Sequence, residues 1–265
     1  AVAHQLAGHV AALCKACAVH DVVETRLQDA EQVLARLALL TVGERGSTLR
    51  LAERSPGQLG QQLIIEAEGK THKISLPLIG AYQAANALVA AGLVIATGGD
   101  VSTTLGNLSR LQPVRGRLER AVITQSGAPV YVDYAHTPDA LEAAIEALRP
   151  HCKGRLILVF GAGGDRDTGK RPEMGAIAAQ LADYVIVTDD NPRSEDPATI
   201  RAAILAAAPG ARDIGGRREA IAAAISEAGP DDIVLLAGKG HEQGQIVGDR
   251  ILPFDDVAVS RECAA

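Results

Sequence analysis

A polar loop, Asp189-Asp190-Asn191-Pro192-Arg193, carries the residue types best suited to chemistry in this chain. It follows the short apolar run 184–188. A carboxylate can hold an ammonium group, a side-chain amide can bind either charge, and a guanidinium can grip a carboxylate through two hydrogen bonds. Together these groups predict a site for a small zwitterion, such as an amino acid.

Three further polar loops also follow apolar runs. They are 133–139, 164–167 and 238–242. Each loop alone has an ordinary structural explanation, because Asp133 could cap a helix, His136 could be a satisfied loop residue and Lys239 could be solvated. The carboxyl ends of parallel strands converge on one edge of a sheet, and open α/β sheets bind ligands there. All the loops together therefore predict one composite site.

The elements that must position these loops alternate between short β-branched runs and helices. The predicted strands cover 130–134, 156–160, 184–188 and 233–236, and the predicted helices begin at Pro138, Pro172, Pro197 and Arg217. Proline is common in the first turn of a helix. Strands that alternate with helices of this length favour a parallel, doubly wound sheet. We therefore expect an α/β fold with a Rossmann-like, mostly parallel sheet over residues 113–265.

Residues 1–112 have a different pattern, and we expect them to form a separate α/β domain. The first forty residues are rich in helix formers. The runs 63–67 and 72–76 flank Gly69, which predicts two antiparallel strands joined by a tight turn. A helix rich in Ala, Leu and Val should follow and stop near Gly98-Gly99. Residues 111–117 read as a linker between the domains.

Composition excludes several classes of partner. Aromatic residues make up 2% of the 265 residues, Trp is absent and the net charge is −6, so a nucleic-acid partner is not expected. Gly, Pro or charged residues interrupt every long apolar stretch, and the first residues lack a basic segment with a cleavage site, so no membrane association is expected. A cytoplasmic protein is the default. The chain opens on Ala1 and its single Met is Met174, so we expect a piece of something longer.

Cysteine spacing offers only a weak metal signal. Cys14 and Cys17 have the spacing of half a zinc site, with several histidines nearby, but no second such pair follows. An alanine-rich helix with small buried thiols explains them better, so we expect no metal site. Cys152 and Cys263 fit no pairing pattern, as expected in a reducing compartment.

Two glycine-containing segments resemble phosphate-binding loops without matching them. Gly69-Lys70-Thr71 lies in the predicted hairpin turn, and Ile64 stands where a first glycine is needed. In 164–170, Arg171 replaces the hydroxyl residue that should follow the lysine, and Arg166 occupies the third glycine position of a dinucleotide fingerprint. The sequence therefore predicts no intact triphosphate cradle.

The loops and the linker together resemble the ATP-dependent Mur ligase family of peptidoglycan synthesis, in particular its diaminopimelate-adding branch. The similarity runs from about Pro77 to Phe254. The shared strings are 111–113, 116–119, 133–139, 160–167, 169–172, 188–193 and 238–242. The resemblance implies that 1–112 is the carboxyl part of a central ATP-binding domain without its P-loop, and that 113–265 is the domain that binds the incoming amino acid.

The resemblance also implies a reaction. ATP phosphorylates the D-glutamate carboxylate of UDP-MurNAc-L-Ala-D-Glu, and the amine of meso-diaminopimelate attacks the acyl phosphate, so the enzyme is an acid–amino-acid ligase that forms a carbon–nitrogen bond. Such catalysis depends on positioning and on charge stabilisation by Mg²⁺ and basic groups. The family's role in cell-wall synthesis links it to cell shape, division and the cell cycle. We expect a monomer that uses ATP and Mg²⁺.

The resemblance assigns roles residue by residue. The implied meso-diaminopimelate contacts are Arg166, Asp190, Asn191, Pro192, Arg193, Gly238 and Glu242. The implied ATP contacts are Asn86, Arg117, Asp133 and His136, of which Arg117 and His136 would support catalysis. Relatives that use L-lysine usually lack the arginine of the first set, so Arg193 argues for diaminopimelate. Tyr82-Gln83 departs from the residues that commonly precede the adenine contact.

The resemblance also shows what the chain lacks. The family's P-loop, its Mg²⁺ ligands, its carbamylated lysine and its amino-terminal uridine-nucleotide domain have no counterpart here, so this chain alone should be catalytically incomplete. A non-catalytic module that binds an amino acid or a nucleotide with the same fold is the alternative. A related folate polyglutamate ligase is a third interpretation, which Arg193 and Glu242 fit poorly.

Overall fold

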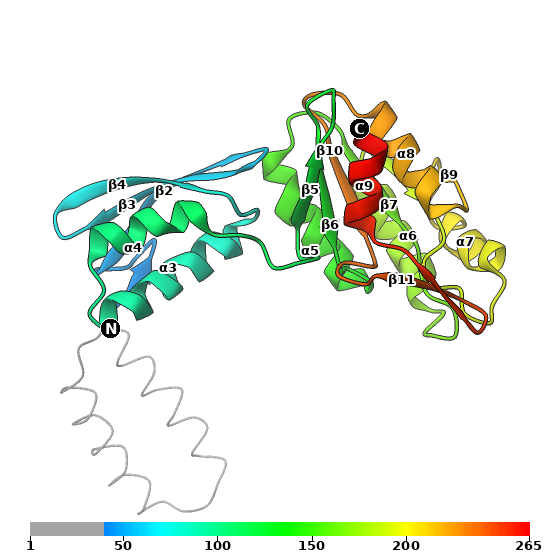
Figure 1. Cartoon of the computed structure of the whole chain (residues 1–265), viewed down its shortest axis with the longest axis horizontal. Coiled ribbons are helices and arrows are strands. Elements are labelled where there is room, and N and C mark those ends of the chain that lie inside the picture. The colour runs from blue at the N-terminus through cyan, green and yellow to red at the C-terminus, as the bar shows by residue number, and fades with distance from the viewer. Residues whose placement is uncertain (1–39) are drawn as a thin grey trace, which may run out of the picture. The chain divides into compact units, whose positions relative to one another are not determined.

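The computed structural model describes residues 40–265, and Val42–Ala265 form one compact unit (Figure 1). The expected amino-terminal helices and the pair Cys14 and Cys17 lie outside the described residues.

A four-stranded sheet and two helices form the first part of this unit. The strands are β1 (Val42–Gly43), β2 (Leu49–Gly57), β3 (Gly60–Ala67) and β4 (Lys70–Leu76), in the order β1-β2-β3-β4. The predicted hairpin is confirmed, since β3 and β4 pair antiparallel and the turn residues Glu68 and Gly69 both have positive φ. Strands β1 and β2 lie outside the sequence prediction.

Helices pack on this sheet through small and branched apolar residues. Helix α3 (Ala81–Ala96) ends just before Gly98, whose φ is 97°, as the glycine signal predicts. Helix α4 (Val101–Asn107) and the 3₁₀ turn η1 (Leu108–Arg110) follow. The shared core includes Leu63, Ile65, Leu88 and Leu105. The predicted boundary at 112/113 falls in the segment between η1 and the next strand.

The second part is built on a six-stranded sheet. Its strands are β5 (Glu119–Ile123), β6 (Pro129–Asp133), β7 (Leu156–Phe160), β8 (Tyr184–Val187), β9 (Arg212–Asp213) and β10 (Ile233–Ala237), in the order β5-β6-β10-β7-β8-β9. Only β5 is antiparallel to its neighbour. The predicted mostly parallel sheet is therefore confirmed, while the edge strands β5 and β9 are additions.

Helices cover both faces of this sheet, as a doubly wound fold requires (Figure 1). Helices α5 (Pro138–Leu148), α6 (Lys170–Leu181) and α7 (Pro197–Leu205) share one core with Leu158 and Leu235. Helices α8 (Arg217–Glu227) and α9 (Asp256–Ala264) share the other core with Ile157 and Val234. Helix α6 begins two residues before the predicted Pro172.

The strand order brings distant loops together. Strand β10 is the last parallel strand in sequence, yet it pairs with both β6 and β7 at the centre of the sheet. The loops after β6, β7, β8 and β10 therefore leave the same edge. A short hairpin of β11 (Gly244–Val247) and β12 (Arg250–Pro253) follows β10 and was not predicted.

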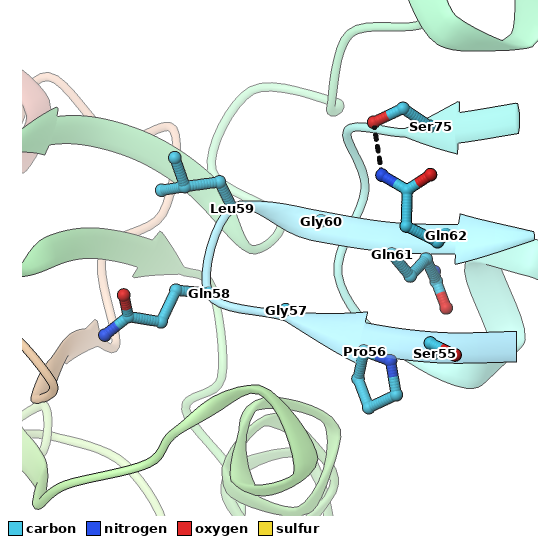
Figure 2. A pocket seen from close by; sticks show the side chains of 9 residues that line it. All are labelled: Ser55, Pro56, Gly57, Gln58, Leu59, Gly60, Gln61, Gln62 and Ser75. Atoms are coloured by element: carbon cyan, nitrogen blue, oxygen red, sulfur yellow. Dashed lines mark hydrogen bonds between the residues drawn. The ribbon is translucent and has the colours of Figure 1, made fainter.

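The turn between β2 and β3 joins the two parts of the unit. Figure 2 shows Gln58 and Leu59 at the tip of this turn, beside a hollow of about 440 Å³. The Tyr131 hydroxyl donates to the Gln58 carbonyl at 2.6 Å, and Arg120 Nη1 donates to the Leu59 carbonyl at 3.1 Å. Burial raises the pKa of Tyr131 to about 12, so this phenol keeps its proton and its donor role. None of the predicted site residues lines this hollow.

No helix in residues 40–265 combines the length and the apolar character that crossing a membrane requires.

Candidate functional site

A pocket of about 490 Å³ lies at the carboxyl ends of the parallel strands. It is lined by Tyr134, His136, Thr137, Ala162, Gly163, Arg166, Asp167, Lys170, Asp190, Asn191, Arg193, Gly238 and Glu242. These residues come from the loops after β6, β7, β8 and β10, so the predicted convergence at one sheet edge is observed.

Glycines let the loops after β7 and β8 approach closely. A Cβ at Gly161 would lie 2.2 Å from the Thr188 carbonyl oxygen, and one at Gly164 would lie 1.9 Å from the Pro192 carbonyl oxygen. Gly164 N–H also donates to the Asn191 carbonyl at 2.9 Å. The two glycines therefore allow the loop after β7 to pack directly against the backbone of the loop that ends in Arg193.

Arg193 sits in a strained backbone conformation with φ of 52°. Its N–H donates to the Ile246 carbonyl at 3.1 Å, and its carbonyl accepts from Gly248 N–H at 2.7 Å. The guanidinium Nη1 donates to the Gly164 carbonyl at 2.8 Å. The β11–β12 hairpin thus holds the backbone of Arg193 while its side chain lines the pocket.

The pocket also contains acidic and amide side chains, which complement the positive charge of Arg193. Asp190 and Asn191 are 6% and 5% exposed, whereas the Glu242 side chain is 34% exposed. Asn191 Nδ2 donates to Glu242 Oε2 at 2.9 Å. An amine that enters the pocket would meet the more accessible Glu242 carboxylate.

Lys239 is fully buried, so the alternative explanation of a solvated lysine is wrong. Its Nζ lies 3.1 Å from Asn191 Oδ1, 3.3 Å from Glu242 Oε2 and 3.4 Å from Asp190 Oδ1. The sequence could not predict this burial, because an apolar run and flanking glycines are compatible with either a buried or an exposed lysine.

Two further cations line the pocket. Arg166 is exposed and its Nη1 donates to the Asp165 carbonyl at 3.1 Å. Lys170, which the sequence reasoning did not assign, donates from Nζ to the His136 carbonyl at 2.8 Å. Burial lowers the pKa of Lys170, and the Asp190 carboxylate opposes that effect. These cations suit a carboxylate or a phosphate.

Aromatic rings and Arg117 gather beside the pocket. The Tyr134 ring lies 4.5 Å from the His136 ring and 5.0 Å from the His241 ring, between centroids. The Arg117 guanidinium carbon lies 4.9 Å from the Tyr134 centroid, a cation–π distance. The sequence predicted no role for Tyr134 or His241, so these tilted ring contacts are a finding of the structure.

Four of the implied contacts lie outside the pocket lining: Arg117, described above, and Asn86, Asp133 and Pro192. Asn86 is exposed on α3. Asp133 is 9% exposed and its oxygens accept from Leu118 N–H at 2.8 Å and Ala135 N–H at 2.9 Å. Burial raises the pKa of Asp133, although these two donors oppose the shift. Pro192 is buried, with its carbonyl against Gly164.

The pocket therefore collects most of the predicted amino-acid site and one predicted ATP contact. The residues brought together are His136, Arg166, Asp190, Asn191, Arg193, Gly238 and Glu242. Arg117 stays beside it through Tyr134.

The described residues fit an anion better than a metal ion. Across residues 40–265, no group of three or more His, Cys, Asp or Glu side chains is arranged to hold a metal. Arg166, Lys170 and Arg193 nevertheless line one pocket with both charges present. The set fits a zwitterion or a phosphate, and it does not by itself fit a Mg²⁺ centre.

Comparison with known proteins gives matches over most of the chain. UDP-N-acetylmuramoyl-L-alanyl-D-glutamate–2,6-diaminopimelate ligase of Zymomonas mobilis is 63% identical over 230 residues, which are 85% of this chain and 47% of that protein. The ligase of the same name from Caulobacter vibrioides is 59% identical over 229 residues, 86% of this chain and 47% of that protein. The chain thus spans about half the length of the curated relatives it matches.

A solved structure supports the same relationship. The structure of a UDP-N-acetylmuramoyl-L-alanyl-D-glutamate–2,6-diaminopimelate ligase aligns with a TM-score of 0.74 at 32% identity, covering 92% of this chain and 51% of the other. Residues 116–240 also match the family model described as "Mur ligase, glutamate ligase domain", and these residues contain the six-stranded sheet and every pocket residue except Glu242. With identities of this size over most of its length, the chain belongs to the Mur ligase family.

Proposed function

We propose that this chain is the amino-acid-selecting part of an ATP-dependent ligase that joins meso-diaminopimelate to UDP-MurNAc-L-Ala-D-Glu. The observation that carries the proposal is the pocket in which Arg193, after β8, and Glu242, after β10, line the same sheet edge together with Asp190 and Asn191. A diamino diacid needs cationic and anionic partners in one site. The names of the relatives support the choice of this substrate.

Each charged group in the pocket has a partner on this substrate. Arg193 pairs with the distal carboxylate, and Arg166 pairs with a second carboxylate or with the acyl phosphate. Glu242 holds an ammonium group, while Asp190 and Asn191 form the polar floor behind it. L-Lysine lacks the second carboxylate, so it would leave Arg193 without a partner.

The proposed reaction forms one amide bond. The D-glutamate carboxylate accepts the terminal phosphoryl group of ATP, with ADP as leaving group, and the amine then attacks the acyl carbon and expels phosphate. Arg117 and Lys170 would stabilise phosphate oxygens. Lys170 donates to the His136 carbonyl, and Arg117 lies over the Tyr134 ring, which in turn contacts the His136 ring. Catalysis of this type rests mainly on positioning.

The remainder of the catalytic machinery belongs, in this proposal, to a longer protein. ATP and Mg²⁺ would be held largely by a P-loop domain and the dipeptide precursor by a uridine-nucleotide domain, with Asn86, Asp133 and Pro192 completing the sites assigned above. Residues 1–112 would be the carboxyl part of the central domain and 113–265 the amino-acid domain. The protein would act as a cytoplasmic monomer in cell-wall synthesis, and so in cell shape, division and the cell cycle.

The pocket is also compatible with a second function. Its lining offers binding groups of both charges, so a module that binds an amino acid or a nucleotide without catalysis is the alternative.

A substrate comparison in a full-length protein that carries this sequence tests the proposal. We expect ATP-dependent addition of meso-diaminopimelate to UDP-MurNAc-L-Ala-D-Glu, with far lower kcat/KM for L-lysine. The purified 265-residue chain should show no turnover, which serves as the control for the missing domains. Equal kcat/KM for L-lysine would contradict the substrate, and no ATP-dependent amide formation with any amino acid would favour the binding module.

A further inference from the structure

The most unusual buried group outside the predicted site is the Lys239 ammonium. Its side chain is 0% exposed, although it follows a strand end beside an open pocket. Lysine is almost never fully buried unless it is paired. The flanking glycines make this placement possible, because Gly238 and Gly240 have φ of 116° and 53° and turn the backbone so that Lys239 lies beneath the pocket floor.

The three acceptors of this ammonium are all residues that line the pocket. They are Asp190 Oδ1, Asn191 Oδ1 and Glu242 Oε2, at 3.4, 3.1 and 3.3 Å. An ammonium has three protons to donate, so its donor capacity matches the three acceptors. Lys239 itself does not line the pocket.

The contacts of Lys239 also fix the orientation of the Asn191 amide. Asn191 Oδ1 accepts from both Lys239 Nζ and Ile246 N–H, the latter at 2.9 Å. Asn191 Nδ2 is then left to donate to Glu242 Oε2 at 2.9 Å. The network has one consistent arrangement, and the position of the Glu242 carboxylate depends on it.

Charge gives Lys239 a second effect on the same groups. Asp190 and Glu242 are like charges that share one ammonium, so its loss would set two carboxylates against each other in a partly buried site. The nearby buried cation Arg217 is already matched by Asp256, through bonds of 2.6 and 2.8 Å. Lys170 and Arg217 also feel the Asp190 carboxylate, but only as nearby charges, whereas Lys239 hydrogen-bonds to both Asp190 and Glu242.

We propose that Lys239 is a positioning residue for amino-acid recognition, which holds Asp190, Asn191 and Glu242 in the arrangement that receives the substrate's ammonium group. This inference rests on the proposed function, because it concerns the same pocket. Lys239 acts through these side chains rather than by touching the substrate.

The test compares Lys239→Met with the wild type in a full-length protein that carries this sequence. Methionine keeps an unbranched side chain of similar length and removes the charge. We expect the KM for meso-diaminopimelate to rise by about 10- to 100-fold, the range for loss of hydrogen bonds to charged groups. The KM for ATP should stay nearly unchanged. A residue that only stabilised the fold would instead affect both substrates alike. Lys153→Met, at an exposed lysine before β7, is the matched control and should leave both constants unchanged.

A double variant separates the charge effect from simple damage. Lys239→Met combined with Asp190→Asn removes one carboxylate together with its counter-charge, so its loss of affinity should be clearly smaller than the sum of the two single losses. Full additivity would overturn the idea that Lys239 acts by balancing these carboxylates.

The outcomes distinguish this inference from the proposed function. If the wild type adds meso-diaminopimelate and folded Lys239→Met has an unchanged KM, the inference fails alone. If the wild type uses another amino acid, the proposed substrate fails, and the same rise in KM for that amino acid would still support the role of Lys239. Should Lys239→Met not fold, Lys239→Gln takes its place, with a raised KM again expected. Failure of both variants to fold would assign the lysine to stability and overturn the proposal.

Discussion

At the scale of single residues, backbone atoms of the polar loops hold the loops in place, while their side chains line the pocket. Arg193 shows this best, because its N–H and carbonyl are bound to the β11–β12 hairpin while its guanidinium lines the pocket. The residue types alone were enough to predict a zwitterion site, and knowledge of the strand order was not needed. They could not predict the burial of Lys239, because burial depends on which distant acids the fold brings to the same edge.

Replacement of Arg193 by alanine should weaken amino-acid binding selectively. Removing one charge-assisted fork should cost on the order of 2 to 4 kcal/mol in binding of meso-diaminopimelate. Steady-state kinetics of the full-length protein should show this as a higher KM for the amino acid. Arg110→Ala, at an exposed residue of η1, is the control and should leave KM unchanged. An unaltered KM in Arg193→Ala would remove this residue from the recognition site.

The ion pair between Arg217 and Asp256 should contribute strongly to stability, since both side chains are 0% exposed. Asp256→Ala leaves a buried guanidinium without its partner and should lower the free energy of unfolding by about 3 to 5 kcal/mol. Urea denaturation measures the change. The exposed pair Arg218 and Glu262 is the control, because Glu262→Ala should cost at most about 1 kcal/mol. A similar loss in both variants would show that burial does not set the difference.

At the scale of elements, the sequence predicted the parallel core strands and the helices between them, because β-branched runs and first-turn prolines are local signals. It missed the strands β1, β2, β5, β9, β11 and β12 and the helices α4 and α9. Strand β9 has only two residues, and the β11–β12 pair is half exposed with no strong alternation. The hairpin matters for the site, since Gln245 Nε2 donates to the Asp190 carbonyl at 2.6 Å.

Because the loops after β7 and β8 are in close contact, adding a single methyl group at Gly164 should strongly affect both binding and stability. In Gly164→Ala the new Cβ would meet the Pro192 carbonyl oxygen at 1.9 Å, so the loop that carries Asp190 and Arg193 must shift. We expect a raised KM for the amino acid and a lower melting temperature.

Gly106→Ala is the matched control for that substitution. It lies in α4 with nothing within 4 Å of the added Cβ, and alanine is the better helix former, so stability should be kept or slightly raised. Wild-type KM and melting temperature in Gly164→Ala would show that the two loops are not tightly coupled.

At the scale of the whole described unit, His151 lies at the joint between the two sheets. It is 2% exposed; its Nδ1 lies 2.7 Å from the Gly57 carbonyl, and its Nε2 accepts from Gly80 N–H at 3.2 Å. Because Nε2 accepts a hydrogen bond, the ring is neutral here. Burial lowers the pKa of His151 below the usual 6.5, although the Gly57 and Gly60 carbonyls oppose the shift.

This joint predicts a loss of stability in mild acid. Since the unfolded chain binds the His151 proton more readily than the folded one, stability is fully present above pH 6.5 and falls as the pH drops from there through the lower folded-state pKa. Thermal unfolding between pH 7.5 and pH 5 should show this fall, and His151→Gln should weaken the dependence. His72→Gln on β4, outside the joint, is the control. An unchanged pH dependence in His151→Gln would exclude this histidine as its source.

The place of β10 at the centre of the sheet has a consequence for the order in which the protein can be made. A ribosome delivers β6, β7 and β8 long before residues 233–237, so until then β6 and β7 each present an unpaired edge where their common neighbour belongs. The complete pocket cannot form during that interval, because the loop that carries Gly238 and Glu242 follows β10. A nascent chain must therefore keep these two edges from pairing wrongly until residues 233–237 are translated, and a premature stop before residue 233 yields a polypeptide with aggregation-prone strands instead of a smaller binding domain.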